Sequence, residues 1–253
     1  MSVKHSFPRI STRGFYSLRN GSTIIRRKYD FYPPEKLEDL SNSHEIVIAV
    51  HGFQNNKSDA LKKFRMVKKR LVYLGYKNPV IGYSYDANVV GAGSKSGGKR
   101  AYHVGKKIAK KNGKNLAHFI KYLKTHNPEM KIRLVGHSLG TEVMLHAVDN
   151  LSKINENKNI IESLHFFGSS ADSNISRTST SKNILITIRS KIKNFYNPND
   201  EVLKTSFQNN PGYKPLGLLG YASKKRSKKF YQLSVKSKNH RFVNYLKTLR
   251  TFP

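Results

Sequence analysis

The chain has 253 residues, of which 37% are hydrophobic, enough for one large domain with a sizeable core. It contains no cysteine, which excludes disulfides and thiolate chemistry of its own. It carries 47 lysines and arginines against 15 aspartates and glutamates, a formal net charge of +32, and such a charge attracts polyanions.

The positive charge is unevenly spread along the chain. Ten basic residues and no acidic one lie between positions 86 and 129, and twelve basic residues and no acidic one follow position 201. The segment KKRSKK spans 224–229, and three lysines would share one face of a predicted helix: Lys106, Lys110 and Lys114. These features predict contact with nucleic acid or with an anionic membrane surface, although a merely solvated basic surface fits the same pattern.

The amino-terminal region carries no targeting pattern. Its first residues, MSVKHSFPRISTRG, lack the apolar core of a secretory signal, and the longest apolar run, 46–50, is too short to cross a bilayer. We therefore expect a cytoplasmic protein. Residues 1–42 form a basic segment in which FYSLRNGSTIIR predicts a β-hairpin at Asn20 and Gly21. This segment is expected to join the sheet of a catalytic domain over 43–253, giving a single domain overall.

From residue 45 onwards, short apolar runs alternate with helix-like patterns. EIVIAV (45–50) is typical of a strand buried on both faces, and the segment after it repeats apolar residues at helical spacing: Leu61, Phe64, Val67 and Leu71. Further strands are predicted over 79–85, 131–136, 160–168, 191–197 and 230–235. Further helices are predicted over 102–126, 141–151 and 240–249. Such alternation is typical of an α/β fold, a mostly parallel sheet with helices on both faces.

The segment KIRLVGHSLGTEVML (131–145) places one serine between a predicted strand and a predicted helix. Gly136 and Gly140 flank Ser138 at two residues on either side, where larger side chains would collide in a sharp turn. The amino end of the following helix would direct its N–H groups at the serine. The pattern predicts a nucleophilic serine, with an ordinary strand-to-helix turn as the alternative.

A nucleophilic serine needs donors for the oxyanion and a histidine base. The predicted donors are the N–H of Leu139, directly after the serine, and that of Phe53, in the loop after strand 45–50. His51 in that loop is better interpreted as fixing the loop. Three histidines follow the serine, and only the last lies in a predicted turn: His146, His165 and His240. His240 is therefore the predicted base.

The base needs an acid that orients it, expected in a loop after a strand between the serine and the histidine. Asp200 in NFYNPNDEVL follows a turn and is the first choice, although it could simply cap the helix that begins at Glu201. Asp172, after the preceding strand, is the competitor, and Glu201 is a third choice.

Four segments resemble motifs of the α/β-hydrolase superfamily, lipase and esterase branch, over roughly residues 43–250: AVHGF, LVGHSLG, YNPNDEVL and NHRFVNYL. The resemblance implies the α/β-hydrolase fold, with about eight strands, and a triad of Ser138, Asp200 and His240. It implies hydrolysis of carboxylic esters or thioesters through an acyl-enzyme, on a small ester or lipid. The competing hypothesis is a scaffold with little or no catalysis that binds nucleic acid or another polyanion.

Little room remains for a helical cap, so the loop 87–100 is the candidate lid. Its small, polar and basic residues do not resemble the apolar lid of an interfacial lipase, which favours a general esterase, phospholipase or thioesterase. No His, Asp and Glu cluster at metal-ligand spacing, and GAGSKSGGK (91–99) lacks the ending of a phosphate-binding loop. We therefore expect neither a metal nor a cofactor.

Overall fold

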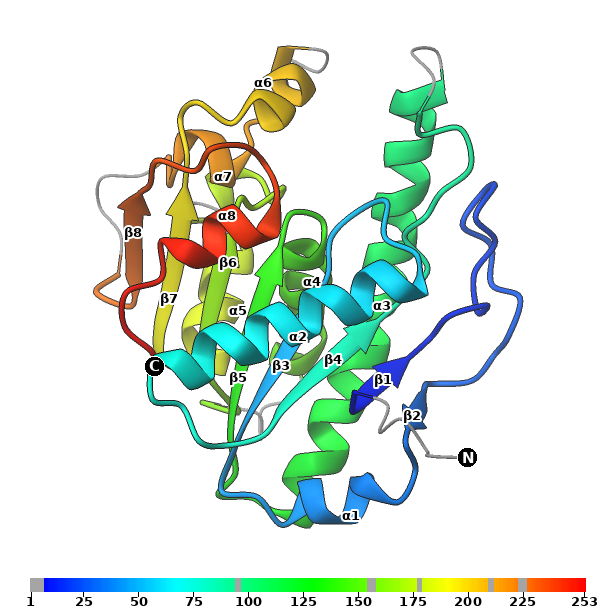
Figure 1. Ribbon diagram of the computed structural model, residues 1–253, viewed down its shortest axis with the longest axis vertical. Coiled ribbons are helices and arrows are strands. Elements are labelled where there is room, and N and C mark those ends of the chain that lie inside the picture. Colours follow the sequence, from blue (N-terminus) through cyan, green and yellow to red (C-terminus); the bar gives the residue numbers. More distant parts are fainter. Residues whose placement is uncertain (1–6, 94–96, 154–157, 177–178, 209–211, 223–226) are drawn as a thin grey trace.

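The computed structural model (Figure 1) describes six stretches of the chain: 7–93, 97–153, 158–176, 179–208, 212–222 and 227–253. One sheet runs through the molecule, with its strands in the order β2-β1-β4-β3-β5-β6-β7-β8. All neighbouring strands run parallel except β1 and β2, which confirms the prediction of a mostly parallel sheet. The strands are β1 (Arg9–Ser11), β2 (Asp30–Tyr32), β3 (Glu45–Val50), β4 (Val80–Ser84), β5 (Lys131–His137), β6 (Ile161–Phe167), β7 (Ile188–Tyr196) and β8 (Phe230–Ser234).

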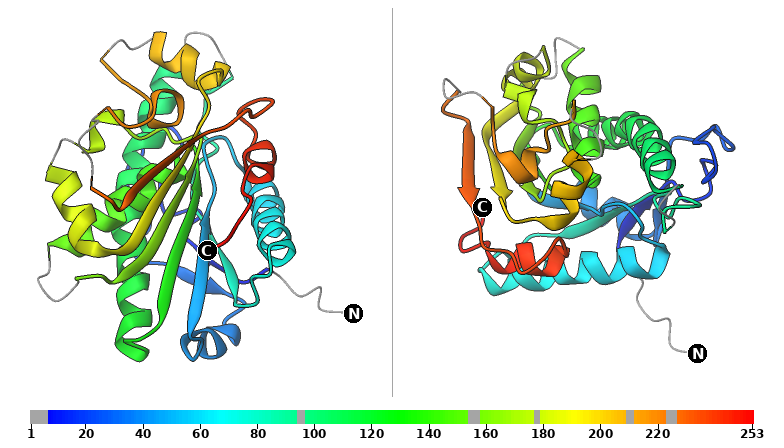
Figure 2. Two further views of the ribbon diagram at one scale, coloured as in Figure 1. Left: turned by 90° about the vertical axis from the view of Figure 1, so that its left-hand side faces the viewer. Right: turned by 90° about the horizontal axis from the view of Figure 1, so that it is seen from above.

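Helices cover both faces of the sheet (Figure 2). One face carries α2 (Lys57–Tyr73) and α8 (Phe242–Lys247), and the opposite face carries α3 (Gly97–His126), α4 (Gly140–Ser152) and α5 (Ser179–Thr187). The remaining elements are shorter: α1 (Lys36–Ser41), a 3-10 turn (Ser173–Ser176), α6 (Glu201–Gln208) and α7 (Leu216–Leu219). Within the described ranges, no helix combines the length and the hydropathy that crossing a membrane would need.

The packing of α2 follows from the spacing of its apolar residues. Asn56 caps the helix, because its side-chain oxygen accepts the N–H of Asp59 at 2.9 Å. The buried stripe differs from the prediction at one position, since Leu61 is only half-buried and Ala60 takes its place. The stripe therefore repeats at four-, three- and four-residue steps along one helix face: Ala60, Phe64, Val67 and Leu71.

The amino-terminal segment joins the sheet through β1, which pairs with both β2 and β4. The predicted hairpin over 15–26 is reduced to a single bridge between Tyr16 and Thr23. Beside this bridge the bonds are irregular, since the N–H groups of Ile24 and Ile25 both donate to the carbonyl of Phe15, at 2.8 and 3.3 Å. The carboxylate of Asp86 accepts the backbone N–H groups of Gly14 at 3.0 Å and of Tyr16 at 3.1 Å, which ties this segment to the loop after β4.

Two elements begin earlier than predicted. α3 begins at Gly97 rather than near residue 102, so the last residues of the predicted loop 87–100 form the first turn of a helix. The strand β7 begins at Ile188 rather than at residue 191. Part of the candidate lid, residues 94–96, lies outside the described residues.

The register of the parallel strands aligns their carboxyl ends. Val50 of β3 lies opposite Gly136 of β5, and His137 at the end of β5 lies opposite Phe167 of β6. Phe167 in turn lies opposite Phe195 of β7. The loops that follow these four strands therefore emerge side by side at one edge of the sheet, which is where ligand sites form in open α/β sheets.

Candidate active site

Ser138 lies on a strained turn at the end of β5. Its φ angle is +51°, in the left-handed region that a residue with a side chain rarely adopts. Side chains on the two flanking glycines would clash. A Cβ on Gly136 would lie 2.2 Å from the sulfur of Met144, and one on Gly140 would lie 2.4 Å from the carbonyl oxygen of His51. The turn thus has the shape of a nucleophile elbow, with α4 beginning at once.

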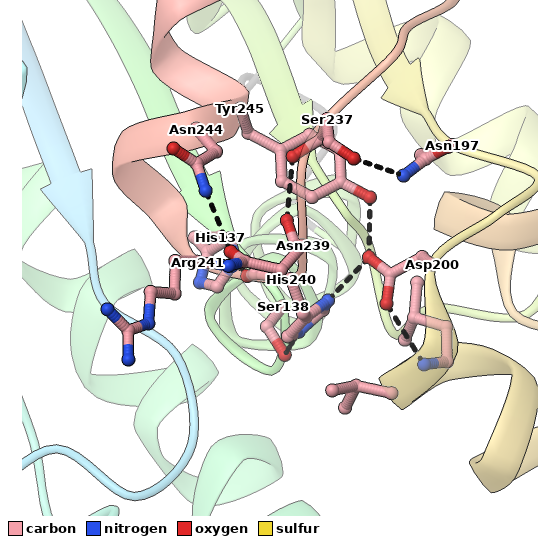
Figure 3. Close-up of polar contacts among 12 residues, drawn as sticks. His137, Ser138, Asn197, Asp200, Ser237, Asn239, His240, Arg241, Asn244 and Tyr245 are labelled. Atoms are coloured by element: carbon pink, nitrogen blue, oxygen red, sulfur yellow. Dashed lines mark hydrogen bonds and ion pairs between the residues drawn. The ribbon is translucent and has the colours of Figure 1, made fainter.

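Three side chains from three loops form a hydrogen-bonded chain at this edge (Figure 3). Nε2 of His240 lies 2.9 Å from Oγ of Ser138, and Nδ1 of His240 lies 2.7 Å from Oδ2 of Asp200. In the tautomer with its proton on Nδ1, the imidazole donates to the carboxylate and accepts from the serine hydroxyl. The structure therefore brings together the predicted serine, histidine and first-choice acid.

Asp200 is fully buried, and it is ionised despite that burial. Burial alone would raise the pKa of its carboxyl, but the hydrogen bond and charge of His240, together with hydrogen bonds from Tyr245 and from the N–H of Leu203, leave the pKa below its usual range. The bond from Leu203 N, at 3.2 Å to Oδ1, places Asp200 at the start of α6. Capping a helix and orienting a histidine, which the sequence presents as alternatives, thus occur in one residue.

The two competing acids lie elsewhere. Oδ1 of Asp172 accepts the N–H of Asn174 at 2.8 Å within its own turn, and it makes no hydrogen bond to His240 among the described contacts. Glu201 is exposed and lies 3.8 Å from Lys204, one helical turn away. Neither carboxylate replaces Asp200 as the partner of the imidazole.

The loop after β3 packs directly against Ser138. A Cβ on Gly52 would lie 3.0 Å from the Cβ of Ser138, which leaves no room for a side chain. Among the described backbone hydrogen bonds, none uses the N–H of Phe53 or of Leu139, the two predicted oxyanion donors. Both N–H groups thus have bonding capacity to offer, and their catalytic role stays a prediction.

His51 holds this loop in place. Its Nε2 accepts the backbone N–H of Tyr85 at 3.1 Å, and its Nδ1 donates to the carbonyl of Gly52 at 2.9 Å. Burial, followed by the nearby charge of Arg13, lowers the pKa of the imidazole well below its usual value, so the ring stays neutral. These contacts agree with the interpretation that His51 fixes the loop.

The loop that carries His240 is held at several points (Figure 3). Nε2 of His137 donates to the carbonyl oxygen of His240 at 2.7 Å, and the side chain of Asn197 donates to the carbonyl of Ser237 at 3.1 Å. Oδ1 of Asn239 accepts the backbone N–H of Arg241 at 3.0 Å, just before α8 begins. The bond from His137 anchors this loop to the end of β5, next to Ser138, and the bond from Asn197 anchors it to the residue after β7.

Sequence reasoning missed Tyr245, whose hydroxyl donates to Oδ2 of Asp200 at 2.6 Å. The tyrosine is fully buried on α8, and its ring packs against Gly168. It lies 45 residues along the chain from Asp200. No local pattern marks such a contact, because a tyrosine on the buried face of a short helix is an ordinary core residue.

We expect Tyr245→Phe to lower the free energy of unfolding by about 1–2 kcal/mol near pH 7, because it removes a hydrogen bond to an ionised carboxylate. The change also raises the pKa of Asp200 in the folded state. A carboxyl with a depressed folded pKa contributes stability above its unfolded pKa, about 3.9, and loses it as the pH falls through the folded value. Urea unfolding across this range should show the difference between variant and wild type shrinking below about pH 4.

Tyr85→Phe is the matched control, since the buried hydroxyl of Tyr85 has no hydrogen-bond partner among the described residues. This variant should not lose stability, and its difference from wild type should not depend on pH in the acid range. A loss for Tyr245→Phe that persists unchanged at low pH would contradict the proposed bond to ionised Asp200.

No group of three or more His, Cys, Asp or Glu side chains that could hold a metal ion occurs among the described residues.

Residues 35–240 match the family described as alpha/beta hydrolase of unknown function (DUF900). None of the curated proteins matches the chain.

Solved structures with a similar arrangement share little sequence with the chain. The product of lin2722 from Listeria innocua is 12% identical over 82% of this chain and 89% of its own, with a TM-score of 0.43. XC6422 from Xanthomonas campestris, described as an a/b serine hydrolase without lid, is 14% identical over 81% and 77%, with a TM-score of 0.42. A cutinase from Trichoderma reesei is 19% identical, and the match spans only 52% of that cutinase, with a TM-score of 0.34. Likeness of this degree says nothing about activity.

Proposed function

The chain belongs to this family of alpha/beta hydrolases, and we propose that it is a serine hydrolase that cleaves carboxylic esters or thioesters through an acyl-enzyme intermediate. One observation carries the proposal, the hydrogen-bonded chain from Ser138 through His240 to buried Asp200. Its serine sits in a left-handed turn between a strand and a helix. A structural serine needs neither a histidine partner nor a strained backbone.

In the first half-reaction, Oγ of Ser138 attacks the acyl carbonyl carbon while Nε2 of His240 takes the hydroxyl proton. The negative charge that develops on the carbonyl oxygen would be met by the N–H groups of Phe53 and Leu139. Asp200 keeps the proton of the imidazole on Nδ1 and stabilises the imidazolium that forms. The tetrahedral intermediate then expels the alcohol or thiol, which takes the proton from Nε2.

In the second half-reaction, water replaces the alcohol. Nε2 of His240 removes a proton from the water as its oxygen attacks the acyl carbon, and the same N–H groups bind the oxyanion again. Collapse of this intermediate returns the proton to Oγ of Ser138 and releases the carboxylic acid. The proposed substrates are small esters, thioesters or lipids.

Labelling with a fluorophosphonate probe tests the proposal. The probe reacts only with an activated serine, so we expect wild type to be labelled and Ser138→Ala not to be. Ser58→Ala, which removes an exposed serine of α2, serves as the control and should label like wild type. If folded wild type takes no label, or if Ser138→Ala is labelled equally, Ser138 is not the nucleophile.

The alternative, a hydrolase scaffold that has lost its activity and binds polyanions, predicts no labelling of wild type. Its support is the net charge of +32. A complete set of hydrogen bonds among serine, histidine and acid favours the enzyme, because nothing in polyanion binding requires that set. The charge is better explained as an additional property of the surface.

A further inference from the structure

The lysines of α3 form only part of the open basic face that their spacing predicts. Nζ of Lys106 lies 3.4 Å from the buried carboxylate of Glu142, and Nζ of Lys111 donates to the carbonyl of Gly21 at 2.9 Å. Of the three lysines predicted to share a face of α3, Lys110 and Lys114 are exposed and Lys106 is half-buried. Half of the other predicted patch, 224–226, lies outside the described residues, and the structure describes 227–229.

A different group of cations surrounds a groove between β8 and α8. The groove has a volume of about 550 Å³ and is bounded on one side by the segment after β8 and on the other by α8 and the turn that follows it. Basic side chains line both sides of the groove: Lys236, Lys238, Lys247 and Arg250. No acidic residue is among its described lining. The lining also includes Ser234 and Asn244, whereas the hydroxyl of Thr248 already donates to the carbonyl of Tyr245 at 2.7 Å.

The positive surface continues onto the sheet beside the groove. Phe195 of β7 packs in the core on the α8 side, so Lys191 and Lys193, at even spacing from it, face the same side. The pKa of Lys193 is lowered by burial and then by the charges of Lys191 and Arg133. Lys191 and Lys193 thus add two cations on this side of the sheet, whereas Arg133 is paired with the carboxylate of Glu45 at 2.8 Å.

An exposed aromatic ring adjoins these cations. Tyr231 of β8 lies opposite Lys193 in the register of the sheet and is 51% exposed. It lies two residues before Leu233, which lines the groove and lies opposite Phe195. Tyr231 therefore faces the same side of the sheet as the groove, next to its basic lining.

We infer that this basic groove binds single-stranded nucleic acid, with backbone phosphates on the bases of the groove and a nucleobase stacked on Tyr231. Non-specific recognition of single strands combines a positively charged groove with aromatic side chains on which bases stack. Phosphate contacts in proteins come from Lys and Arg together with polar side chains such as Ser and Asn, and all four types line this groove. The concave shape suits one strand, whereas a membrane surface would be met by protruding apolar side chains.

Fluorescence anisotropy with labelled oligothymidylate tests the inference on the full-length chain. Four phosphate contacts predict that the binding constant falls about 50-fold as salt rises from about 50 to 200 mM. A triple variant with Lys236, Lys247 and Arg250 each changed to Glu should bind at least about 10-fold more weakly and lose most of this salt dependence. Tyr231→Ala should weaken binding about 5-fold or more and leave the salt dependence unchanged.

The control carries the same change of net charge at another exposed site. Arg65, Lys68 and Lys69 lie exposed on α2, and changing all three to Glu should weaken binding less than about 3-fold. Circular dichroism establishes that each variant is folded. Equal losses in the two triple variants would mean that bulk charge binds the strand, and the inference would be wrong.

Two further ligands separate the remaining outcomes. Duplex DNA of matching length should bind more weakly than the single strand and should not respond to Tyr231→Ala. Duplex binding as tight as single-strand binding would overturn the assignment. The assignment would also be overturned if the triple groove variant lost affinity for phosphatidylserine vesicles but kept its affinity for the oligonucleotide. The groove would then be a membrane-binding surface.

Discussion

Asp200→Asn is expected to lower kcat for a short-chain ester by about 10⁴-fold while leaving the protein folded. An amide in this place no longer holds the proton of His240 on Nδ1, so Nε2 is not free to accept the proton of Ser138. The amide oxygen can still accept the N–H of Leu203, so the start of α6 is retained. Hydrolysis of a p-nitrophenyl ester, with circular dichroism as the check on folding, measures the effect.

Asp172→Asn is the matched control, because it makes the same chemical change at the acid that competes for this role in the sequence. It should leave kcat within about 3-fold of wild type, since Asp172 bonds within its own turn. A large loss for Asp172→Asn together with a small one for Asp200→Asn would reverse the assignment of the acid.

The second large effect combines a loss of activity with a difference in stability. Ser138→Ala and Ser138→Gly should each lower kcat by at least about 10⁴-fold, because both remove the nucleophile. Only the glycine variant also relieves the left-handed backbone at φ +51°. We therefore expect Ser138→Gly to be more stable than Ser138→Ala by about 1 kcal/mol.

Urea unfolding of the two variants measures this difference. Both lack the bond from the serine to His240, so the comparison isolates the backbone at one position. Equal stability of the two variants, or a less stable glycine variant, would show that the turn stores no strain for the nucleophile. Residual hydrolysis well above the expected level in Ser138→Ala would point to another nucleophile.

The sequence alone predicted those features that depend on neighbouring residues. The spacing of apolar residues within each segment distinguishes strands from helices, and their alternation predicted the parallel sheet with helices on both faces. The glycine spacing of the nucleophile elbow is also a local pattern, although only the clash of Gly136 with Met144 is local and that of Gly140 is with the loop after β3. The hairpin predicted over 15–26 was too regular, because a turn signal at Asn20 and Gly21 does not determine how many residues on either side pair, and only the Tyr16–Thr23 bridge forms.

Only the tertiary structure decided which side chains meet. The turn before Asp200 favoured it over Asp172, but both follow strands, and the contact with the imidazole depends on where the loop of His240 crosses the sheet. Tyr245 reaches Asp200 only because α8 packs beside β6. The cations of the groove are likewise brought together by tertiary structure, from the segment after β8 and from α8 with the turn that follows it. Local sterics act within a few residues of the chain. The distances between side chains on different loops depend on the order of strands in the sheet, which no short segment encodes.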